Sequence, residues 1–168
     1  MVIPIGGLPD VDYPETTDLD RVFVPMGVPI YKGGMMECKT FFEAEPDLIN
    51  LALQASEKIV FEPVPGTDRL PVVSVGIIVT GDHFIASTHK SEWLFQAFEA
   101  LSTEMEGAAV AQVAYIHDIP WVIIRTNSDI ADDIAEDITK ELLQYAAETS
   151  AKLVVKMVEL LAEEKKPY

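Results

Sequence analysis

Three carboxylate residues stand where apolar segments of this sequence end and a loop or helix begins: Glu104, Glu106 and Asp129. One expected helix and one expected strand lie between the first two and the third. Because the carboxyl ends of neighbouring parallel strands meet at one edge of a sheet, this order can bring the three carboxylates together. A carboxylate can accept two hydrogen bonds from a vicinal diol, and a carboxylic acid can protonate the ring nitrogen of a base. The pattern therefore predicts a nucleoside site.

An aromatic ring is expected at the same edge, because Phe84 lies in the loop 81–85 that follows the apolar residues 71–80. Such a ring can stack on any nucleobase. Nearby carboxylates stabilise the oxocarbenium-like transition state through which an N-glycosidic bond breaks. A simpler interpretation stays open for Glu106 and Asp129, since acidic residues are common at helix starts, where they complement the helix dipole.

The sequence offers no pattern for a metal or a cofactor. His83, His89 and His117 are scattered, without the His-x-x-x-His or Cys-x-x-Cys spacing of a metal site. No glycine-rich loop matches a phosphate-binding or dinucleotide fingerprint. We therefore expect neither a metal nor a cofactor.

Composition narrows the class of partner. A net charge of −16 over 168 residues, with few arginines, disfavours nucleic acid and an anionic membrane surface. A neutral or cationic small molecule fits better.

The one cysteine, Cys38, cannot form an intramolecular disulfide, which favours a reducing compartment. No apolar run approaches the ~20 residues of a membrane helix, and no signal peptide is recognisable, so we expect a soluble, cytoplasmic protein.

The elements that position these residues follow from periodicity and from turn residues. Strands are expected at residues 1–5, 21–24, 71–80, 101–105 and 120–126. Helices are expected at residues 46–59, 92–100, 106–118 and 138–164, with Ser91 as an N-cap. Residues 71–80 and 120–126 are almost continuously apolar, which predicts burial on both faces of a parallel sheet. Alternating strands and helices from residue 71 onward indicate an α/β layered fold.

Residues 9–42 form a long stretch rich in Pro, Gly and acidic residues, and we expect an irregular connection there. It carries several apolar side chains: Tyr31, Met35, Met36, Phe41 and Phe42. Two interpretations remain, a hydrophobic plug or subunit interface on one hand and the wall of a ligand pocket on the other.

Three short motifs together resemble the nucleoside phosphorylase/nucleosidase superfamily. They are TGDHFI at residues 80–85, TEMEGAA at 103–109 and RTNSDIAD at 125–132. Within that superfamily the motifs are most similar to 5′-methylthioadenosine/S-adenosylhomocysteine nucleosidases. The resemblance covers residues 70–162 well and residues 1–69 only loosely.

The resemblance implies a role for each matching position. Asp129 would protonate the purine at N7, with Ser128 orienting it. Glu106 would bind the ribose hydroxyls. Met105 would pack on the sugar, Phe84 would stack on adenine, and the backbone of Ile85 would read the edge of the base. Glu104 and Arg125 would complete the substrate-binding residues, although no separate task for Glu104 is evident.

The resemblance also implies an architecture. The expected fold is a three-layer sandwich with a mixed, largely parallel central sheet flanked by helices, and residues 1–168 would form a single, partial domain of this kind. Members of the family are dimers or larger, so a homodimer is expected, with a partner's aromatic residue closing the 5′ end of the pocket. Members also begin with a strand whose Glu activates water, followed by a glycine-rich segment. Neither is present here, so we expect an N-terminally truncated version of the fold.

The predicted function is hydrolysis of the N-glycosidic bond of adenine thionucleosides, a step of methionine salvage, giving adenine and the thioribose. A purine nucleoside phosphorylase of the same superfamily is the first alternative, although it would need cationic groups around phosphate. A catalytically incomplete nucleoside-binding protein is the second, because the water-activating Glu is missing.

Overall fold

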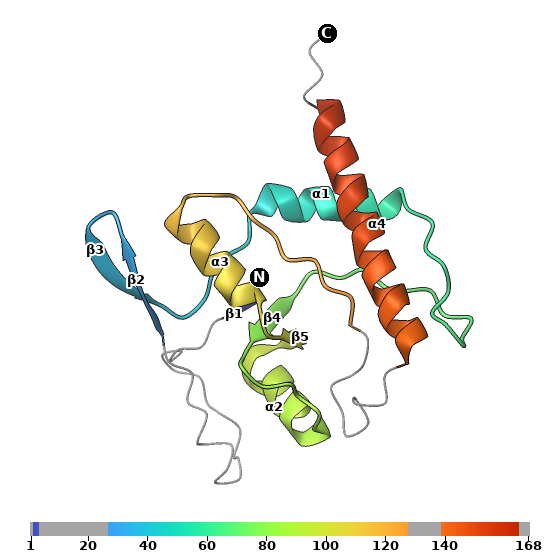
Figure 1. The fold of residues 1–168 in the computed structure, drawn as a ribbon, viewed down its shortest axis with the longest axis horizontal. Helices are drawn as coiled ribbons and strands as arrows, with labels where there is room; N and C mark the ends of the chain where they lie inside the picture. Colours follow the sequence, from blue (N-terminus) through green and yellow to red (C-terminus); the bar gives the residue numbers. More distant parts are fainter. Residues whose placement is uncertain (1, 4–26, 128–138, 165–168) are drawn as a thin grey trace.

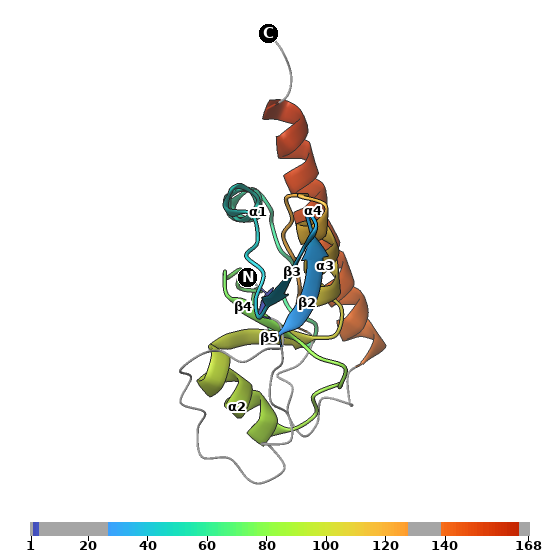
Figure 2. The ribbon, with the colours of Figure 1, turned by 90° about the vertical axis from the view of Figure 1, so that its left-hand side faces the viewer.

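The computed structural model of the protein describes residues 2–3, 27–127 and 139–164. Its strands are β1 (Val2–Ile3), β2 (Val28–Lys32), β3 (Met35–Lys39), β4 (Ile77–Thr80) and β5 (Ala100–Glu104). Its helices are α1 (Pro46–Glu57), α2 (Thr88–Phe98), α3 (Gly107–Ile116) and α4 (Lys140–Glu164). Figures 1 and 2 show the β4–β5 region in the middle of the molecule, with α2 towards one end and α1 towards the other.

A parallel sheet in the order β1-β4-β5 carries the predicted site edge. Its register aligns Val2 with Ile78 and, at the far end, Thr80 with Glu104. The backbone N–H of Gly81 donates to the carbonyl of Glu104 at 3.0 Å, so the pairing continues just past the end of β4. Since the strands are parallel, Thr80 and Glu104 share the carboxyl edge of the sheet. The expected extended segment at residues 101–105 is thereby confirmed as β5.

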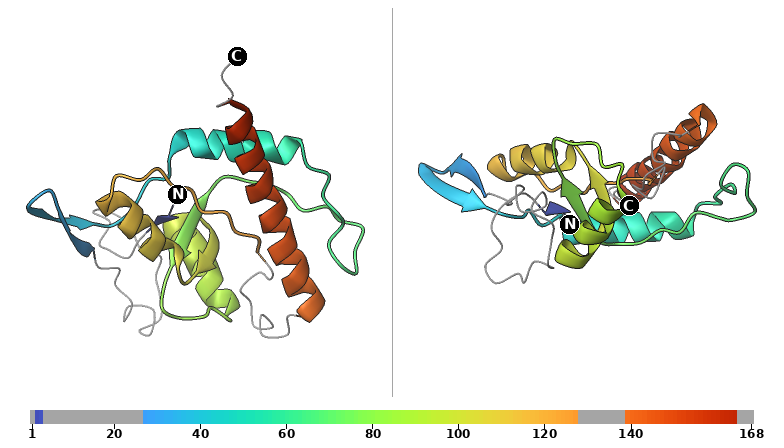
Figure 3. Two further views of the ribbon diagram at one scale, coloured as in Figure 1. Left: turned by 45° about the horizontal axis from the view of Figure 1, so that its top comes forward. Right: turned by 90° about the horizontal axis from the view of Figure 1, so that it is seen from below.

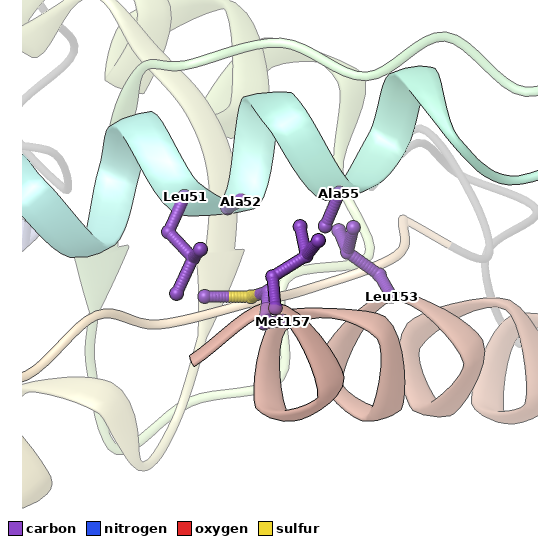
Figure 4. Packing of buried hydrophobic residues seen from close by; sticks show 6 residues of the cluster. Leu51, Ala52, Ala55, Leu153 and Met157 are labelled. Atoms are coloured by element: carbon purple, nitrogen blue, oxygen red, sulfur yellow. The ribbon is translucent and has the colours of Figure 1, made fainter. Parts of the chain in front are cut away.

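The largest hydrophobic cluster among the described residues joins two helices that are far apart in the sequence. α1 begins at Pro46, which suits a first helical turn, and buries Leu51, Ala52 and Ala55. Figure 4 shows these side chains facing Leu153 and Met157 of α4. The apolar stripes predicted for residues 46–59 and 138–164 are therefore the faces along which α1 and α4 pack.

Helix α2 starts earlier than expected. Ser87, rather than Ser91, is its N-cap, and the Ser87 hydroxyl accepts a hydrogen bond from the backbone N–H of Lys90 at 3.3 Å. The helix ends at Phe98, and the left-handed backbone of its C-cap residue Glu99 (φ 52°) turns the chain into β5. Phe98 and Trp93 of this helix pack with Val79 of β4 in one hydrophobic cluster. The prediction was wrong at the N-terminus because two serines four residues apart offer the same capping signal.

Part of the predicted irregular connection 9–42 is a β-hairpin. β2 and β3 pair antiparallel from Val28–Lys39 to Lys32–Met35, and the turn between them is Gly33-Gly34. Both glycines have positive φ, 59° and 83°, as a tight two-residue hairpin turn requires. The hairpin projects at one end of the molecule, on the side away from α4 (Figure 3). The prediction was wrong here because the Gly-Gly pair was taken as a break in regular structure rather than as a turn.

The hairpin packs against α3 through Ile30, with Phe42, just beyond β3, in the same cluster around Ala111. Lys32 donates to the Tyr115 carbonyl at 2.6 Å and forms an ion pair with Asp118. The Tyr115 hydroxyl donates to Glu37 at 2.7 Å. Of the apolar side chains singled out above, Phe42 alone is buried, whereas Tyr31, Met35, Met36 and Phe41 are exposed. The predicted strand at residues 21–24 lies outside the described residues.

The two long buried strands that the sequence predicts are not formed as expected. Of residues 71–80, only β4 is a strand, and Val72 is 88% exposed rather than buried on both faces. Residues 120–126 have no strand pairing among the described residues, although the Trp121 carbonyl accepts from the Glu45 N–H at 2.8 Å. Both segments line a cavity of about 330 Å³. A strand needs a ladder partner, which an apolar run alone does not supply.

Candidate functional site

Glu104 is the best-anchored side chain at the carboxyl edge of the sheet. Its Oε1 accepts from the Thr80 hydroxyl and from the Gly107 N–H at 2.9 Å. Its Oε2 accepts from the N–H groups of Glu106 and Gly107 at 3.1 and 2.7 Å, and from Arg125 Nη2 at 2.5 Å. The Glu104 side chain is only 7% exposed. The strand register explains the first contact, because it sets Thr80 directly opposite Glu104.

These donors decide the protonation state of Glu104. Burial is the largest single effect, and it raises the pKa of the carboxyl group. The hydrogen bonds from Thr80, Glu106 and Gly107 and the charge of Arg125 act in the other direction and outweigh burial, so the pKa lies below its ordinary value. Glu104 is therefore an anion at neutral pH, in spite of its burial.

Arg125 joins two carboxylates from neighbouring elements. Its Nη2 contacts Glu104 Oε2 at 2.5 Å and Glu106 Oε2 at 3.0 Å. The Arg125 side chain is 38% exposed and that of Glu106 is 67% exposed. Glu104 lies at the end of β5, Glu106 is the residue that precedes α3, and Arg125 comes from the extended segment after α3. The charged group thus runs from a buried anion, through a cation, to an exposed anion.

The start of α3 closes tightly over this group. The Ala108 N–H donates to the Thr80 hydroxyl at 2.9 Å, so Thr80 accepts from the helix while it donates to Glu104. A side chain at residue 107 would place its Cβ 2.8 Å from Glu104 Oε1, so the present close approach of the carboxylate to the helix start depends on glycine there. α3 begins at Gly107 and ends at Ile116, close to the predicted helix 106–118.

A cavity of about 1000 Å³ opens beside Glu104 and Arg125. Residues from α2, β5 and the segment after α3 line it, including Ser91, Phe95, Thr103, Glu104, Arg125 and Asn127. The Ser102 hydroxyl donates to Asn127 Oδ1 at 2.7 Å, and Asn127 Nδ2 donates to the Leu101 carbonyl at 3.0 Å. The Asn127 side chain therefore connects the end of the segment 120–127 to strand β5.

The predicted site residues fall into three groups. Glu104, Glu106 and Arg125 are brought together by direct contacts. Phe84 is 57% exposed, Met105 is exposed and Ile85 is half-buried. Neither these three nor Glu106 is among the described residues that line the cavity. Ser128 and Asp129 lie outside the described residues, so their roles stay predictions.

The sequence did not predict a role for two residues that contact Glu104, Thr80 and Gly107. Thr80 is the last residue of β4 and holds both Glu104 and α3, and Gly107 admits the carboxylate. A signal for Thr80 was available, because a hydroxyl residue ends an apolar run directly before a glycine.

Within residues 2–3, 27–127 and 139–164 no group of three or more metal-ligating side chains is found. None of the helices in that part of the chain is long and apolar enough to cross a membrane.

Residues 29–159 match the family model described as "Phosphorylase superfamily". The chain belongs to this superfamily. It is 39% identical over 100 residues to a 5′-methylthioadenosine/S-adenosylhomocysteine nucleosidase of Psychromonas ingrahamii, an alignment that covers 59% of this chain and 39% of that protein. The resemblance stated from the three motifs is confirmed.

Two solved structures share the fold. One is a nucleosidase of the same name from Neisseria meningitidis in complex with methylthio-immucillin-A, with 34% identity and a TM-score of 0.61 over 76% of this chain and 52% of that one. The other is a futalosine hydrolase of Helicobacter pylori, with 28% identity and a TM-score of 0.64 over 94% of this chain and 57% of that one. The chain thus spans about 39–57% of the length of these relatives. The predicted α/β class is confirmed.

Proposed function

We propose that this protein acts on the N-glycosidic bond of adenine thionucleosides such as 5′-methylthioadenosine and S-adenosylhomocysteine, releasing adenine by hydrolysis. The observation that carries the proposal is the contact of Arg125 with Glu104 and Glu106 at the carboxyl edge of a parallel sheet. In a chain of the phosphorylase superfamily that is similar to such nucleosidases, an exposed carboxylate held there suits a ribose diol.

Each proposed role follows the chemistry of the residue. Glu106 accepts hydrogen bonds from the two ribose hydroxyls. Asp129, oriented by Ser128, donates a proton to N7 of adenine, so the electron pair of the glycosidic bond leaves with a neutral base. The sugar becomes oxocarbenium-like, and water adds at its anomeric carbon and gives up one proton to solvent. Phe84 stacks on the base, Ile85 reads its edge through the backbone, and Met105 packs on the sugar.

The finer architecture belongs to the same proposal. The described sheet would be part of a three-layer sandwich, and the protein would work as a homodimer in the cytoplasm, within methionine salvage. The exposed side chains of Tyr31, Met35 and Met36 on the β2–β3 hairpin support an interface there, because large apolar groups in solvent favour association.

Adenine release from 5′-methylthioadenosine, followed by chromatography, tests the proposal. We expect Asp129→Asn to lower the rate by about 10²–10⁴-fold, the range that a positioned general acid contributes. Glu57→Gln is a matched control, since this glutamate is exposed at the end of α1. An unchanged rate in Asp129→Asn would remove Asp129 from its role. No release together with no binding in calorimetry would remove the proposed function.

The same assay separates hydrolysis from phosphorolysis. The Arg125 guanidinium already contacts two carboxylates, which offsets the positive charge that phosphate would require. We therefore expect the rate to be independent of phosphate. Turnover that needs phosphate and yields a sugar 1-phosphate would assign a phosphorylase instead, and binding of the nucleoside without turnover would assign a binding protein.

A further inference from the structure

The hydrogen-bonding capacity of Glu104 is taken up by the protein itself. A carboxylate offers about four lone-pair sites. In Glu104 they face the Thr80 hydroxyl, the N–H groups of Glu106 and Gly107, and Arg125 Nη2. With the side chain only 7% exposed, no site is left for a ribose hydroxyl. Glu104 is therefore poorly placed for the direct substrate contact that the sequence predicts.

Glu106 has the opposite surroundings. Its carboxylate contacts Arg125 through Oε2 at 3.0 Å, and the side chain is 67% exposed. Glu106 precedes the first turn of α3, and no side-chain capping hydrogen bond holds it there. Arg125 is the one ion-pair partner that the structure gives to Glu106 among the described residues. The position of the exposed carboxylate thus depends on where Arg125 is held.

We propose that Glu104 is a positioning residue, which holds Arg125 and through it fixes the carboxylate of Glu106 for the ribose hydroxyls. This rests on the proposed function. The contact between Arg125 Nη2 and Glu104 is the shorter of its two carboxylate contacts, 2.5 against 3.0 Å. Glu104 is also the more rigid partner, because three other donors fix it. The buried anion is the anchor, and the exposed anion is the part that meets the ligand.

Charge explains why an anion is needed at residue 104. Two carboxylates bound to one guanidinium leave the group with one net negative charge, so the cation stays bound between them. A neutral amide at residue 104 leaves one carboxylate, on the exposed side, where solvent screening weakens the pair. Arg125 is then free to follow Glu106 into solvent, and both side chains lose their fixed positions.

Glu104→Gln is a suitable probe because it retains the shape. The amide oxygen can replace Oε2 and accept from Arg125, Glu106 and Gly107. The amide nitrogen can replace Oε1 and donate to the Thr80 hydroxyl, which rotates to accept. The variant therefore removes the charge while it preserves most hydrogen bonds. Glu57→Gln is the matched control, a change of the same chemistry on an exposed helix end.

Two calorimetric titrations of the full chain test the functional half of the inference. We expect Glu104→Gln to raise the Kd for 5′-methylthioadenosine by about tenfold or more, the effect of weakening a charge-assisted contact. The Kd for free adenine, which has no ribose, should change by less than about twofold. Glu57→Gln should change neither. An equal loss of affinity for both ligands, or no loss for either, would overturn the inference.

A double-mutant cycle separates positioning from direct contact. If Glu104 acts through Glu106, the loss in Glu104→Gln/Glu106→Gln should be close to that of Glu106→Gln alone. Independent contacts of both carboxylates with the sugar would instead give multiplied losses, and that result would refute the positioning role.

NMR tests the structural half without any ligand. We expect the Nη protons of Arg125 to exchange slowly in the parent chain and in Glu57→Gln, and at least about tenfold faster in Glu104→Gln. Unchanged exchange would overturn the inference whether or not a nucleoside binds. If the parent chain binds no nucleoside, the proposed function fails, and this measurement alone decides whether Glu104 positions Arg125.

Discussion

Gly107 gives the sharpest test of the geometry around Glu104. In Gly107→Ala the new Cβ would lie 2.8 Å from Glu104 Oε1 and 3.1 Å from its carboxyl carbon. A separation below 3.0 Å cannot persist, so the carboxylate or the start of α3 must shift. The end of a glutamate side chain normally moves at little cost. Here Thr80, Glu106, Gly107 and Arg125 hold it in place.

The size of the effect is the difference between two terms. Alanine in place of glycine within a helix stabilises by about 0.5–1 kcal/mol. Loss of one hydrogen bond to a charged group costs about 1.5–3 kcal/mol. If the shift breaks one such bond, Gly107→Ala lowers the free energy of unfolding by about 0.5–2.5 kcal/mol. The sign is opposite to the one that helix propensity alone would give.

Urea unfolding followed by the fluorescence of the two tryptophans, of which Trp93 is buried, measures this difference in the free energy of unfolding. Gly81→Ala is the matched control, because a Cβ there meets nothing within 4 Å and the φ angle is not positive. We expect Gly81→Ala to be neutral or slightly stabilising. If Gly107→Ala were also neutral or stabilising, the carboxylate would not be held as described, and the reasoning that makes Glu104 an anchor would be wrong.

Two further predictions concern pH and the core. The pKa of Glu104 is lowered in the folded protein, so its ionised form contributes stability above the unfolded value of about 4.3, and this contribution is lost as the pH falls through the folded pKa. The stability difference between the wild type and Glu104→Gln in urea unfolding should therefore shrink below about pH 4.3, and a constant difference from pH 7 to pH 3 would contradict the assignment. Leu153→Ala should lower the free energy of unfolding by about 2–5 kcal/mol, because Leu153 packs into the α1–α4 cluster. Leu143→Ala, at an exposed position of α4, should have a much smaller effect. Similar losses in both variants would mean that this cluster is not the core.

Local signals predicted the helices well. Pro46 and an apolar stripe identify α1, and the small residues after Glu106 identify α3. Both kinds of signal act within a few residues, so they do not depend on the rest of the fold. The error at the start of α2 was of the same local kind, a choice between Ser87 and Ser91.

Strands were harder to predict because pairing is not local. Residues 121–124 form an apolar run like that of residues 77–79, yet only residues 77–80 pair with strands on both sides among the described residues. The former instead place Val122 and Ile124 against the α1–α4 cluster. Composition gives the tendency of a segment to be extended, whereas the ladder partner is set by segments elsewhere in the chain.

The sequence by itself determined the superfamily and predicted the edge of the sheet for the candidate site, because motifs and strand ends are contiguous in the chain. It also named Glu104, Glu106 and Arg125 together, and the structure brings these three side chains into contact. Only the tertiary structure separated their tasks. The register of β4 and β5 sets Thr80 against Glu104, and folding brings Arg125, a residue 21 positions later, to both carboxylates. Burial then encloses the carboxylate of Glu104 and leaves that of Glu106 exposed, a difference in surroundings that two glutamates in one motif do not reveal.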